Sequence, residues 1–197
     1  MREYTIAAIP GDGIGTEVIA AGLKVLEVLA GRDRGFKLNI EHFPWSSAYY
    51  KQHGYYIPEG GLDKLKQCDA IFFGAVGAPD VPDHLSLWGL RLPICQGFDQ
   101  YANVRPARVL PGITSPLREG QDIDWVVIRE NTEGEYSGNG GRAHRGLPEE
   151  VATETSVFTR TGVTRIHKFA FELARTRKRK HLTLVTKSNA QIGRAHV

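Results

Sequence analysis

The segment from Trp125 to Tyr136 constrains the fold of this chain most strongly, because a short apolar run there gives way at once to polar side chains. The run Trp-Val-Val-Ile suits a strand that is buried on both faces, as in a parallel sheet flanked by helices. Ligands of such sheets bind beyond the carboxyl ends of the strands. Arg129 stands there with a planar fork that can hold a carboxylate, and Tyr136 offers a phenol that can transfer a proton. The pattern predicts an anion site at this strand end, and a plain polar loop is the alternative.

The composition indicates a globular protein. Of its 197 residues, 41% are hydrophobic and 24% are charged. The 25 basic and 22 acidic residues are mixed along the chain, so the net charge of +3 argues only weakly for nucleic acid and fits an acidic small substrate equally well. No apolar stretch approaches the ~20 residues that a membrane-spanning helix needs. We therefore expect neither nucleic acid nor a membrane as a partner.

Two features of the sequence bear on where the protein resides. Cys68 and Cys95 show neither the spacing of metal ligands nor a disulfide framework. The N-terminus, Met-Arg-Glu-Tyr-Thr-Ile, enters a strand-like run without a signal peptide. These features predict a cytoplasmic protein.

Strand and helix patterns alternate along the first part of the chain, which predicts an α/β fold. Strands are expected over Tyr4–Ile9, Phe36–His42 and Asp69–Gly74, and the last is so apolar that it should lie inside the sheet. A helix is expected from Ile14 to about Gly31, with a shorter one near Leu62–Gln67. Spacings of three and four residues predict that the first helix turns these residues inward: Ile14, Val18, Ala21, Val25, Val28 and Leu29.

Two glycine-rich turns follow these strands. The first, residues 10–15, has the spacing G-x-G-x-G rather than G-x-G-x-x-G, and no acidic residue closes the second strand in the usual position. A tight strand-to-helix turn is therefore favoured over an ordinary dinucleotide loop. The second turn, Gly74–Gly77, follows the third strand, where small residues either let a cofactor approach the backbone or serve local geometry alone.

The middle of the chain supplies a second arginine. Leu85–Gln96 is expected to be helical in part, with an irregularity at Pro93. Ala102–Leu110 is expected to form a strand in which Asn103 and Arg105 point to the same face. Arg105 is thus a second candidate for binding an anion, although a lone strand arginine more often faces solvent.

Beyond Tyr136 the sequence predicts a projecting hairpin arm over about 137–159, because a segment with four glycines is followed by an alternating, strand-like one. Such an arm exposes backbone edges, so we expect it to pair with a partner subunit. A helix is expected over Thr161–Lys178, and its basic C-terminal end suits the helix dipole better than a phosphate site. A strand over Leu182–Thr186 would then present Lys187, which could act as a general base if partly desolvated or could be an ordinary surface lysine. The inward residues of the helix are expected to be Val163, Ile166, Ala170, Leu173 and Ala174.

Five short motifs occur in a fixed order along the chain. They are Ile-Pro-Gly-Asp-Gly-Ile-Gly (9–15), Phe-Gly-Ala-Val-Gly (73–77), Tyr-Ala-Asn-Val-Arg-Pro (101–106), Arg-Glu-Asn-Thr-Glu-Gly-Glu-Tyr (129–136) and Thr-Lys-Ser-Asn (186–189). Together they resemble the metal-dependent β-decarboxylating dehydrogenases, which act on isocitrate, 3-isopropylmalate, D-malate and tartrate. Residues 45–50 and 81–89 are most similar to the tartrate and D-malate branch of that family.

The resemblance extends from residue 4 to about residue 191 and implies an isocitrate/isopropylmalate dehydrogenase-like α/β fold with two domains. Residues 1–103 would form the N-terminal part of the first, cofactor-side domain. Residues 104–197 would begin the second domain, which binds substrate and forms a homodimer. The sequence after Thr-Lys-Ser-Asn does not resemble the family, so we expect the C-terminal part of the fold to be missing.

The resemblance also implies a reaction, the NAD-linked oxidation and β-decarboxylation of a small 2-hydroxy dicarboxylic acid such as D-malate or tartrate. Mg²⁺ or Mn²⁺ would assist it, held by acidic residues that are expected in the missing part. A fragment without them should be inactive. The alternatives are 3-isopropylmalate as the substrate, or a non-catalytic module that binds an acidic metabolite or a partner.

The implied roles of individual residues follow from the motifs. Arg105 and Arg129 would bind the substrate carboxylates. Lys187, from the partner subunit, would remove the hydroxyl proton, and Tyr136 would protonate the enolate left after decarboxylation. Asn189 would lie near the nicotinamide, and the cofactor loop would consist of Gly74, Ala75, Val76 and Gly77.

One position departs from the family pattern. Family members usually carry an arginine four residues before the aspartate that corresponds to Asp99, and this chain has Cys95 there. Arg91 lies four residues before Cys95 and would share its helix face. We therefore expect Arg91 to compensate in part for the missing arginine in substrate binding, and the alternative is a lower affinity for the substrate.

Overall fold

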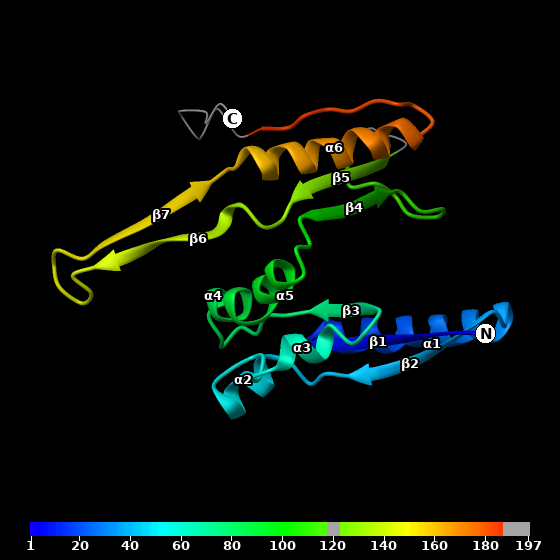
Figure 1. The fold of residues 1–197 in the computed structure, drawn as a ribbon, viewed down its shortest axis with the longest axis horizontal. Coiled ribbons are helices and arrows are strands. Elements are labelled where there is room, and N and C mark those ends of the chain that lie inside the picture. Colours follow the sequence, from blue (N-terminus) through cyan, green and yellow to red (C-terminus); the bar gives the residue numbers. More distant parts are fainter. Residues whose placement is uncertain (118–122, 187–197) are drawn as a thin grey trace. The chain divides into compact units, whose positions relative to one another are not determined.

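The computed structural model of the chain describes residues 1–117 and 123–186 (Figure 1). They belong to two compact units, of which the first is Met1–Gly97 and the second begins at Phe98. The described strands of each unit pair only with strands of the same unit. The division of the intact fold into two domains at residues 103 and 104 stays a prediction.

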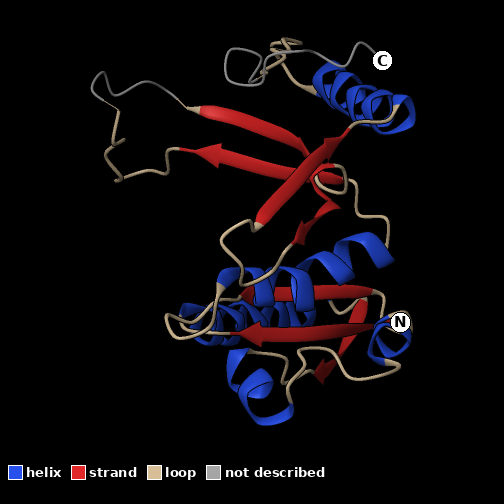
Figure 2. Ribbon diagram, turned by 90° about the vertical axis from the view of Figure 1, so that its left-hand side faces the viewer, coloured by secondary structure: helices blue, strands red, loops and turns tan. Residues whose placement is uncertain are grey.

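The first unit contains a parallel sheet of three strands in the order β2-β1-β3 (Figure 2). They are β1 (Arg2–Gly11), β2 (Phe36–His42) and β3 (Ala70–Ala75), close to the expected ranges. The central strand β1 carries the fully buried residues Ala7, Ala8 and Ile9. The prediction that β3 lies inside the sheet is wrong for the described residues, because β3 pairs with β1 alone and its residues are at most half-buried.

Helix α1 (Ile14–Asp33) packs on this sheet with a different face from the predicted one. Its buried residues are Gly15 and Ile19, and a Cβ on Gly22 would lie only 2.5 Å from the Phe72 ring. The small residues let the helix backbone approach the sheet, and a count of large apolar side chains cannot detect that preference. The predicted inward residues Ile14, Val18, Val25, Val28 and Leu29 are instead 51–67% exposed, and Ala21 is exposed too.

Short helices complete the first unit. They are α2 (Ser47–His53), α3 (Gly61–Leu65), α4 (Asp83–Ser86) and α5 (Leu92–Gly97), with a π-helical turn η1 (Leu87–Arg91) between the last two. The π turn directly precedes Leu92 and Pro93. Proline has no N–H and its ring crowds the carbonyl four residues earlier, so a wider turn accommodates it. The irregularity predicted at Pro93 is therefore confirmed.

The second unit begins with an antiparallel pair, β4 (Ala102–Arg108) and β5 (Asp124–Glu130), against which α6 (Arg160–Thr176) packs. The prediction of a doubly buried parallel strand over Trp125–Ile128 is therefore wrong in the described residues. Val126 and Ile128 are half-buried, whereas Trp125 and Val127 are 51% and 50% exposed. A strand covered by a helix on one side buries only alternate residues. All five predicted inward residues of α6 are buried or half-buried.

Strands β6 (Gly134–Ala143) and β7 (Val151–Val157) form an antiparallel hairpin where the arm is expected (Figure 1). Its pairing with a partner subunit stays a prediction. The strand predicted over Leu182–Thr186 is absent, because these residues are irregular and no described strand pairs with them. No helix in the described parts of the chain is both long and apolar enough to cross a membrane.

The exposed apolar face of α1 generates a prediction about self-association. Replacing Val18 and Val25 together by lysine should reduce association of the chain, because it removes two exposed apolar side chains. The unfolding free energy should change by less than about 0.5 kcal/mol per site. Analytical ultracentrifugation and thermal unfolding measure the two quantities.

Glu27→Lys is the matched control, since it changes the charge by the same amount at an exposed position of α1 without removing apolar surface. An equal decrease in association in the control would mean that charge, rather than the apolar face, governs the effect.

Candidate functional site

The two glycine-rich turns of the first unit lie in direct backbone contact. A Cβ on Gly11 would lie 2.0 Å from the carbonyl oxygen of Ala75, and one on Gly74 would lie 2.2 Å from that of Pro10. A Cβ on Gly15 would meet both segments, at 2.2 Å from the oxygen of Pro10 and 2.6 Å from the nitrogen of Ala75. These glycines therefore serve close packing of the two turns, as the tight-turn interpretation of residues 10–15 predicts.

Gly77 differs from the other glycines of these turns. Its φ is 140°, and no described atom outside its chain neighbours lies within 4 Å of the position that a Cβ would take. The backbone is thus accessible at Gly77. Within the predicted cofactor loop, Gly74 packs against the backbone of Pro10, whereas the backbone of Gly77 is exposed and could be approached by a ligand.

Asp12 joins the turn and the loop to α2. One carboxylate oxygen accepts hydrogen bonds from the Ser47 hydroxyl (2.7 Å) and the Gly77 N–H (2.9 Å), and the other accepts from the Ser47 N–H (2.8 Å). The backbone N–H of Asp12 also donates to the Ala75 carbonyl at 2.6 Å. Sequence analysis missed Asp12, although an acid between two glycines at the end of a buried strand is itself a signal of a structural acceptor.

A second contact joins the same part of the chain to α2. The Lys51 ammonium donates a hydrogen bond to the carboxylate of Asp80, and this hydrogen bond lowers the pKa of that carboxyl group. The two side chains are 46% and 65% exposed, so solvent screens the ion pair. This ion pair therefore holds α2 to the neighbouring segment less strongly than the hydrogen bonds between Asp12 and Ser47 do.

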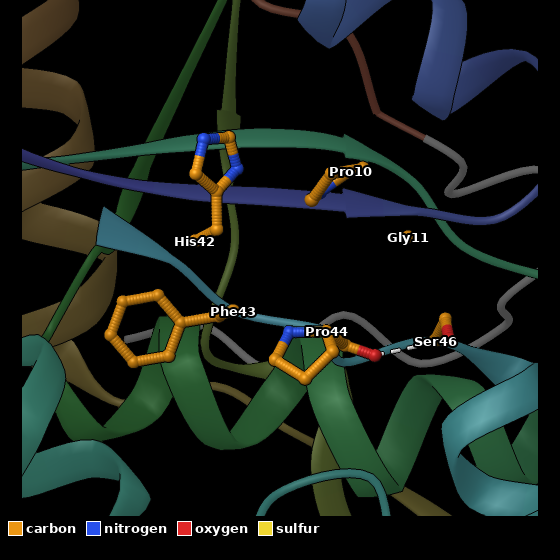
Figure 3. A pocket seen from close by; sticks show the side chains of 6 residues that line it. All are labelled: Pro10, Gly11, His42, Phe43, Pro44 and Ser46. Atoms are coloured by element: carbon orange, nitrogen blue, oxygen red, sulfur yellow. Dashed lines mark hydrogen bonds between the residues drawn. The ribbon is translucent and has the colours of Figure 1, made fainter. Parts of the chain in front are cut away.

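A cleft of about 420 Å³ lies at the carboxyl ends of β1 and β2 (Figure 3). In Figure 3 the side chains of His42 and Phe43 point away from each other, as successive residues at a strand end do. The Ser46 hydroxyl donates to the Pro44 carbonyl at 3.1 Å and accepts from the N–H of Tyr49, so its role is to cap α2. The cleft is lined by Pro10, Gly11, His42, Phe43, Pro44 and Ser46.

In the second unit the strand register places both predicted arginines on one face. Asn103 lies opposite Arg129, and Arg105 lies opposite Val127. Directly opposed residues of an antiparallel pair share a face, as do residues two apart on one strand. Arg105 and Arg129 therefore lie on the same side of the β4-β5 pair, where Arg105 is exposed and Arg129 is half-buried.

One N–H group of Arg129 has no hydrogen-bond partner among the described residues. Its Nη2 donates to Asn131 Oδ1 at 3.4 Å, and its guanidinium carbon lies 5.4 Å from the centre of the Tyr136 ring. Its Nε is buried and has no hydrogen-bond partner among the described residues. Asn131 is 4% exposed and donates to the Gln100 carbonyl at 3.2 Å. The structure thus places the Arg129 guanidinium against the Tyr136 ring, and the roles of these two residues in binding and proton transfer stay predictions.

The acids between these two residues serve the local structure. Glu130 accepts from the N–H groups of Thr132 (2.9 Å) and Glu133 (2.6 Å). Glu133 accepts from the N–H and the hydroxyl of Thr159, whose hydroxyl in turn accepts from the Gly162 N–H at 2.9 Å. Glu133 and Thr159 together cap the N-terminus of α6.

Arg165 is a second residue that sequence analysis missed. It donates to both carboxylate oxygens of Asp99 (2.8 and 3.1 Å) and to the Thr132 hydroxyl (2.8 Å). Its guanidinium carbon lies 4.6 Å from the centre of the Tyr101 ring. Arg165 thereby fixes α6 to the loop that carries Asn131 and to the residues before β4. Its inward position on α6 could not be inferred from the apolar pattern of the helix.

The remaining predicted site residues are Arg91, Lys187 and Asn189, and Cys95 is the position that departs from the family pattern. Arg91 ends η1, is half-buried and interacts with other groups. Cys95 is only 8% exposed within α5, so an arginine could not replace it without a rearrangement of the neighbouring core. Lys187 and Asn189 lie outside the described residues. Within residues 1–117 and 123–186, no three histidine, cysteine or acidic side chains gather in a way that could hold a metal ion.

Comparison with known proteins gives one consistent result. A family model described as isocitrate/isopropylmalate dehydrogenase matches residues 5–192. A probable tartrate dehydrogenase/decarboxylase from Agrobacterium vitis is 72% identical over 193 residues, covering 97% of this chain and 54% of the relative. A D-malate dehydrogenase (decarboxylating) from Escherichia coli K12 is 54% identical over 193 residues, covering 96% of this chain and 53% of that enzyme.

Solved structures agree with the sequence matches. The crystal structure of isocitrate dehydrogenase from Methylococcus capsulatus superimposes with a TM-score of 0.77 at 32% identity, covering 95% of this chain and 52% of that one. The chain therefore spans about half the length of the curated relatives that it matches.

The cap of α6 generates a prediction about stability. Thr159→Ala should lower the unfolding free energy of the second unit by about 1 kcal/mol, within the ~0.5–2 kcal/mol that loss of an N-cap costs. Thr161→Ala removes the same hydroxyl from an exposed helix position and should change it by less than about 0.5 kcal/mol. Urea unfolding followed by circular dichroism compares the two variants. Equal stability of both would show that the Glu133–Thr159 cap contributes nothing.

Proposed function

The chain belongs to the isocitrate/isopropylmalate dehydrogenase family, and from this premise we propose that it supplies half of an enzyme for NAD-linked oxidation of a small 2-hydroxy dicarboxylic acid. D-malate and tartrate are the proposed substrates, and loss of the β-carboxylate as CO₂ follows the oxidation. The relatives named tartrate dehydrogenase/decarboxylase and D-malate dehydrogenase, at 72% and 54% identity, support this choice.

The observation that carries the proposal is the arginine pair on one face of β4 and β5. A dicarboxylate presents two anionic groups, and two guanidinium groups on one surface match that charge pattern. Arg129 binds one carboxylate through its guanidinium group, and Arg105 binds the other. Tyr136, whose ring lies against the Arg129 guanidinium, donates a proton to the carbon from which CO₂ departs.

The described residues fit a nicotinamide cofactor at one position. The backbone at Gly77 is open, and small residues allow a ligand to come close. A nicotinamide cofactor held by the backbone at Gly77 would supply the hydride acceptor for oxidation of the alcohol carbon. The proposed base that takes the hydroxyl proton is Lys187 of the partner subunit, and Asn189 is proposed to lie near the nicotinamide.

The described residues do not fit Mg²⁺ or Mn²⁺. Hard divalent cations need several oxygen ligands, and no suitable group exists in the described parts of the chain. Glu130 and Glu133 are occupied by backbone N–H groups. No step of the proposed mechanism is therefore assigned to a metal ion held by these residues, and dependence on Mg²⁺ or Mn²⁺ stays a prediction.

The homodimer is part of the same proposal. Strands β6 and β7 form a two-stranded hairpin whose residues are largely exposed. Isolated two-stranded hairpins are marginally stable in water, so a second copy of the arm is the proposed partner.

The central experiment compares two proteins. In a chimaera, residues 1–191 are joined to the C-terminal half of the Agrobacterium vitis relative, which matches this chain at 72% identity. We expect the chimaera to form NADH from NAD, Mn²⁺ and D-malate or tartrate, and we expect the 197-residue chain alone to form none. Absorbance of NADH measures both. Protein-dependent NADH formation by the chain alone would show that the metal site is misplaced, and an inactive chimaera would count against the proposed function.

A second prediction tests the arginine. Arg129→Lys in the chimaera should raise the KM for the hydroxy acid about tenfold or more, because an ammonium cannot form two parallel hydrogen bonds with a carboxylate. The KM for NAD should change little. Arg108→Lys, on the opposite face of β4, is the matched control and should leave both constants unchanged. Equal KM values for Arg129→Lys and its control would remove Arg129 from the substrate site.

A further inference from the structure

We propose that Asp12 is a positioning residue for the cofactor, because its carboxylate holds the Gly74–Gly77 loop in the conformation that seats NAD. The inference rests on the proposed function, since it takes that loop as the cofactor loop. Asp12 itself does not touch the substrate in this scheme. Its effect is transmitted through the backbone of Gly77.

Asp12 binds the loop at two points. Its backbone N–H donates to the Ala75 carbonyl, and its side chain accepts from the Gly77 N–H, so both peptides around Val76 are held by one residue. Asp12 is in turn anchored, because it follows the buried strand β1 directly. The hydrogen bonds of Asp12 therefore fix the position of the loop relative to β1, the central strand of the sheet.

The geometry requires a side chain that accepts hydrogen bonds at both of its terminal atoms. Three donors converge on the carboxylate, namely two backbone N–H groups and the Ser47 hydroxyl. The single hydroxyl proton of Ser47 is used towards Asp12, so Tyr56 is the donor in the 3.0 Å contact between Tyr56 and Ser47. Ser47 and Tyr56 are 1% and 2% exposed. A buried chain of hydroxyl groups therefore points at the carboxylate and strengthens its role as acceptor.

The loop itself offers little alternative support. Gly77 is exposed and adopts a φ of 140°, outside regular secondary structure. Glycine has no side chain that could anchor the loop at position 77. The hydrogen bond from the Gly77 N–H to the Asp12 carboxylate therefore holds the backbone there. Without that bond, only a fraction of the molecules would present the loop ready for NAD, and the apparent affinity falls by that fraction.

Asp12→Asn tests the inference with almost no change in size. The amide nitrogen takes the place of one carboxylate oxygen, so either the Gly77 N–H or the Ser47 N–H loses its acceptor, depending on how the amide is turned. Asp12→Ala removes both acceptors and therefore always breaks the hydrogen bond from Gly77. In the chimaera we expect the KM for NAD to rise about tenfold, while kcat and the KM for the hydroxy acid change less than about twofold. A purely structural role would instead lower the fraction of active enzyme and leave the KM for NAD unchanged.

Asp80→Asn is the matched control, because it removes an exposed acid that is also bound to α2. Its KM for NAD should stay within about twofold of the parent value. An unchanged KM for NAD in Asp12→Ala, or an equal rise in the Asp80→Asn control, would overturn the inference.

A measurement on the 197-residue chain separates the inference from the proposed function. Hydrogen–deuterium exchange at the Gly77 amide should be about tenfold faster in Asp12→Ala than in the parent, and unchanged in Asp80→Ala. Faster exchange together with an inactive parent chimaera would support the positioning role while the dehydrogenase proposal fails. Unchanged exchange would overturn the positioning role even if the parent chimaera forms NADH.

Discussion

The close approach of two backbone segments governs the first unit. The turn after β1 and the end of β3 meet through Gly11, Gly15 and Gly74, where any side chain would overlap a backbone atom. Such proximity leaves peptide groups that need partners, and burying an unpaired N–H costs about 1–3 kcal/mol. Asp12 meets this need with its own N–H and its carboxylate. Small residues and one acid thus fix the edge of the sheet where the cofactor is proposed to bind.

The same principle explains which parts of the first unit could be predicted. Strand positions followed from apolar runs, and the irregular helix followed from Pro93, because both depend on local sequence. The buried face of α1 did not, since Gly15 and Gly22 select it through backbone approach while larger apolar residues remain exposed. The edge position of β3 depends on which strands pair, and an apolar run alone carries no information about pairing.

In the second unit, residue types were predicted more successfully than their surroundings. The two-residue period correctly predicted that Arg105 and Asn103 share a face. The proximity of the Arg129 guanidinium to the Tyr136 ring is a finding of the structure. The antiparallel pairing of β5 and the contribution of Arg165 depend on contacts between segments far apart in the chain. No local pattern encodes such contacts, so sequence analysis could name the arginine and the phenol but not the network that holds them.

The acids and the arginines of the candidate site differ in how far their hydrogen-bonding groups are paired within the protein. In the second unit, Glu130 and Glu133 each accept hydrogen bonds from backbone N–H groups and so hold the local loops in place. The guanidinium groups of Arg129 and Arg165, by contrast, each keep a buried Nε that has no partner among the described residues. A surface whose acids are internally satisfied and whose arginine retains a donor attracts anions and offers little to a cation. This asymmetry suits a dicarboxylate better than a metal ion and supports the proposal that Arg129 binds the substrate.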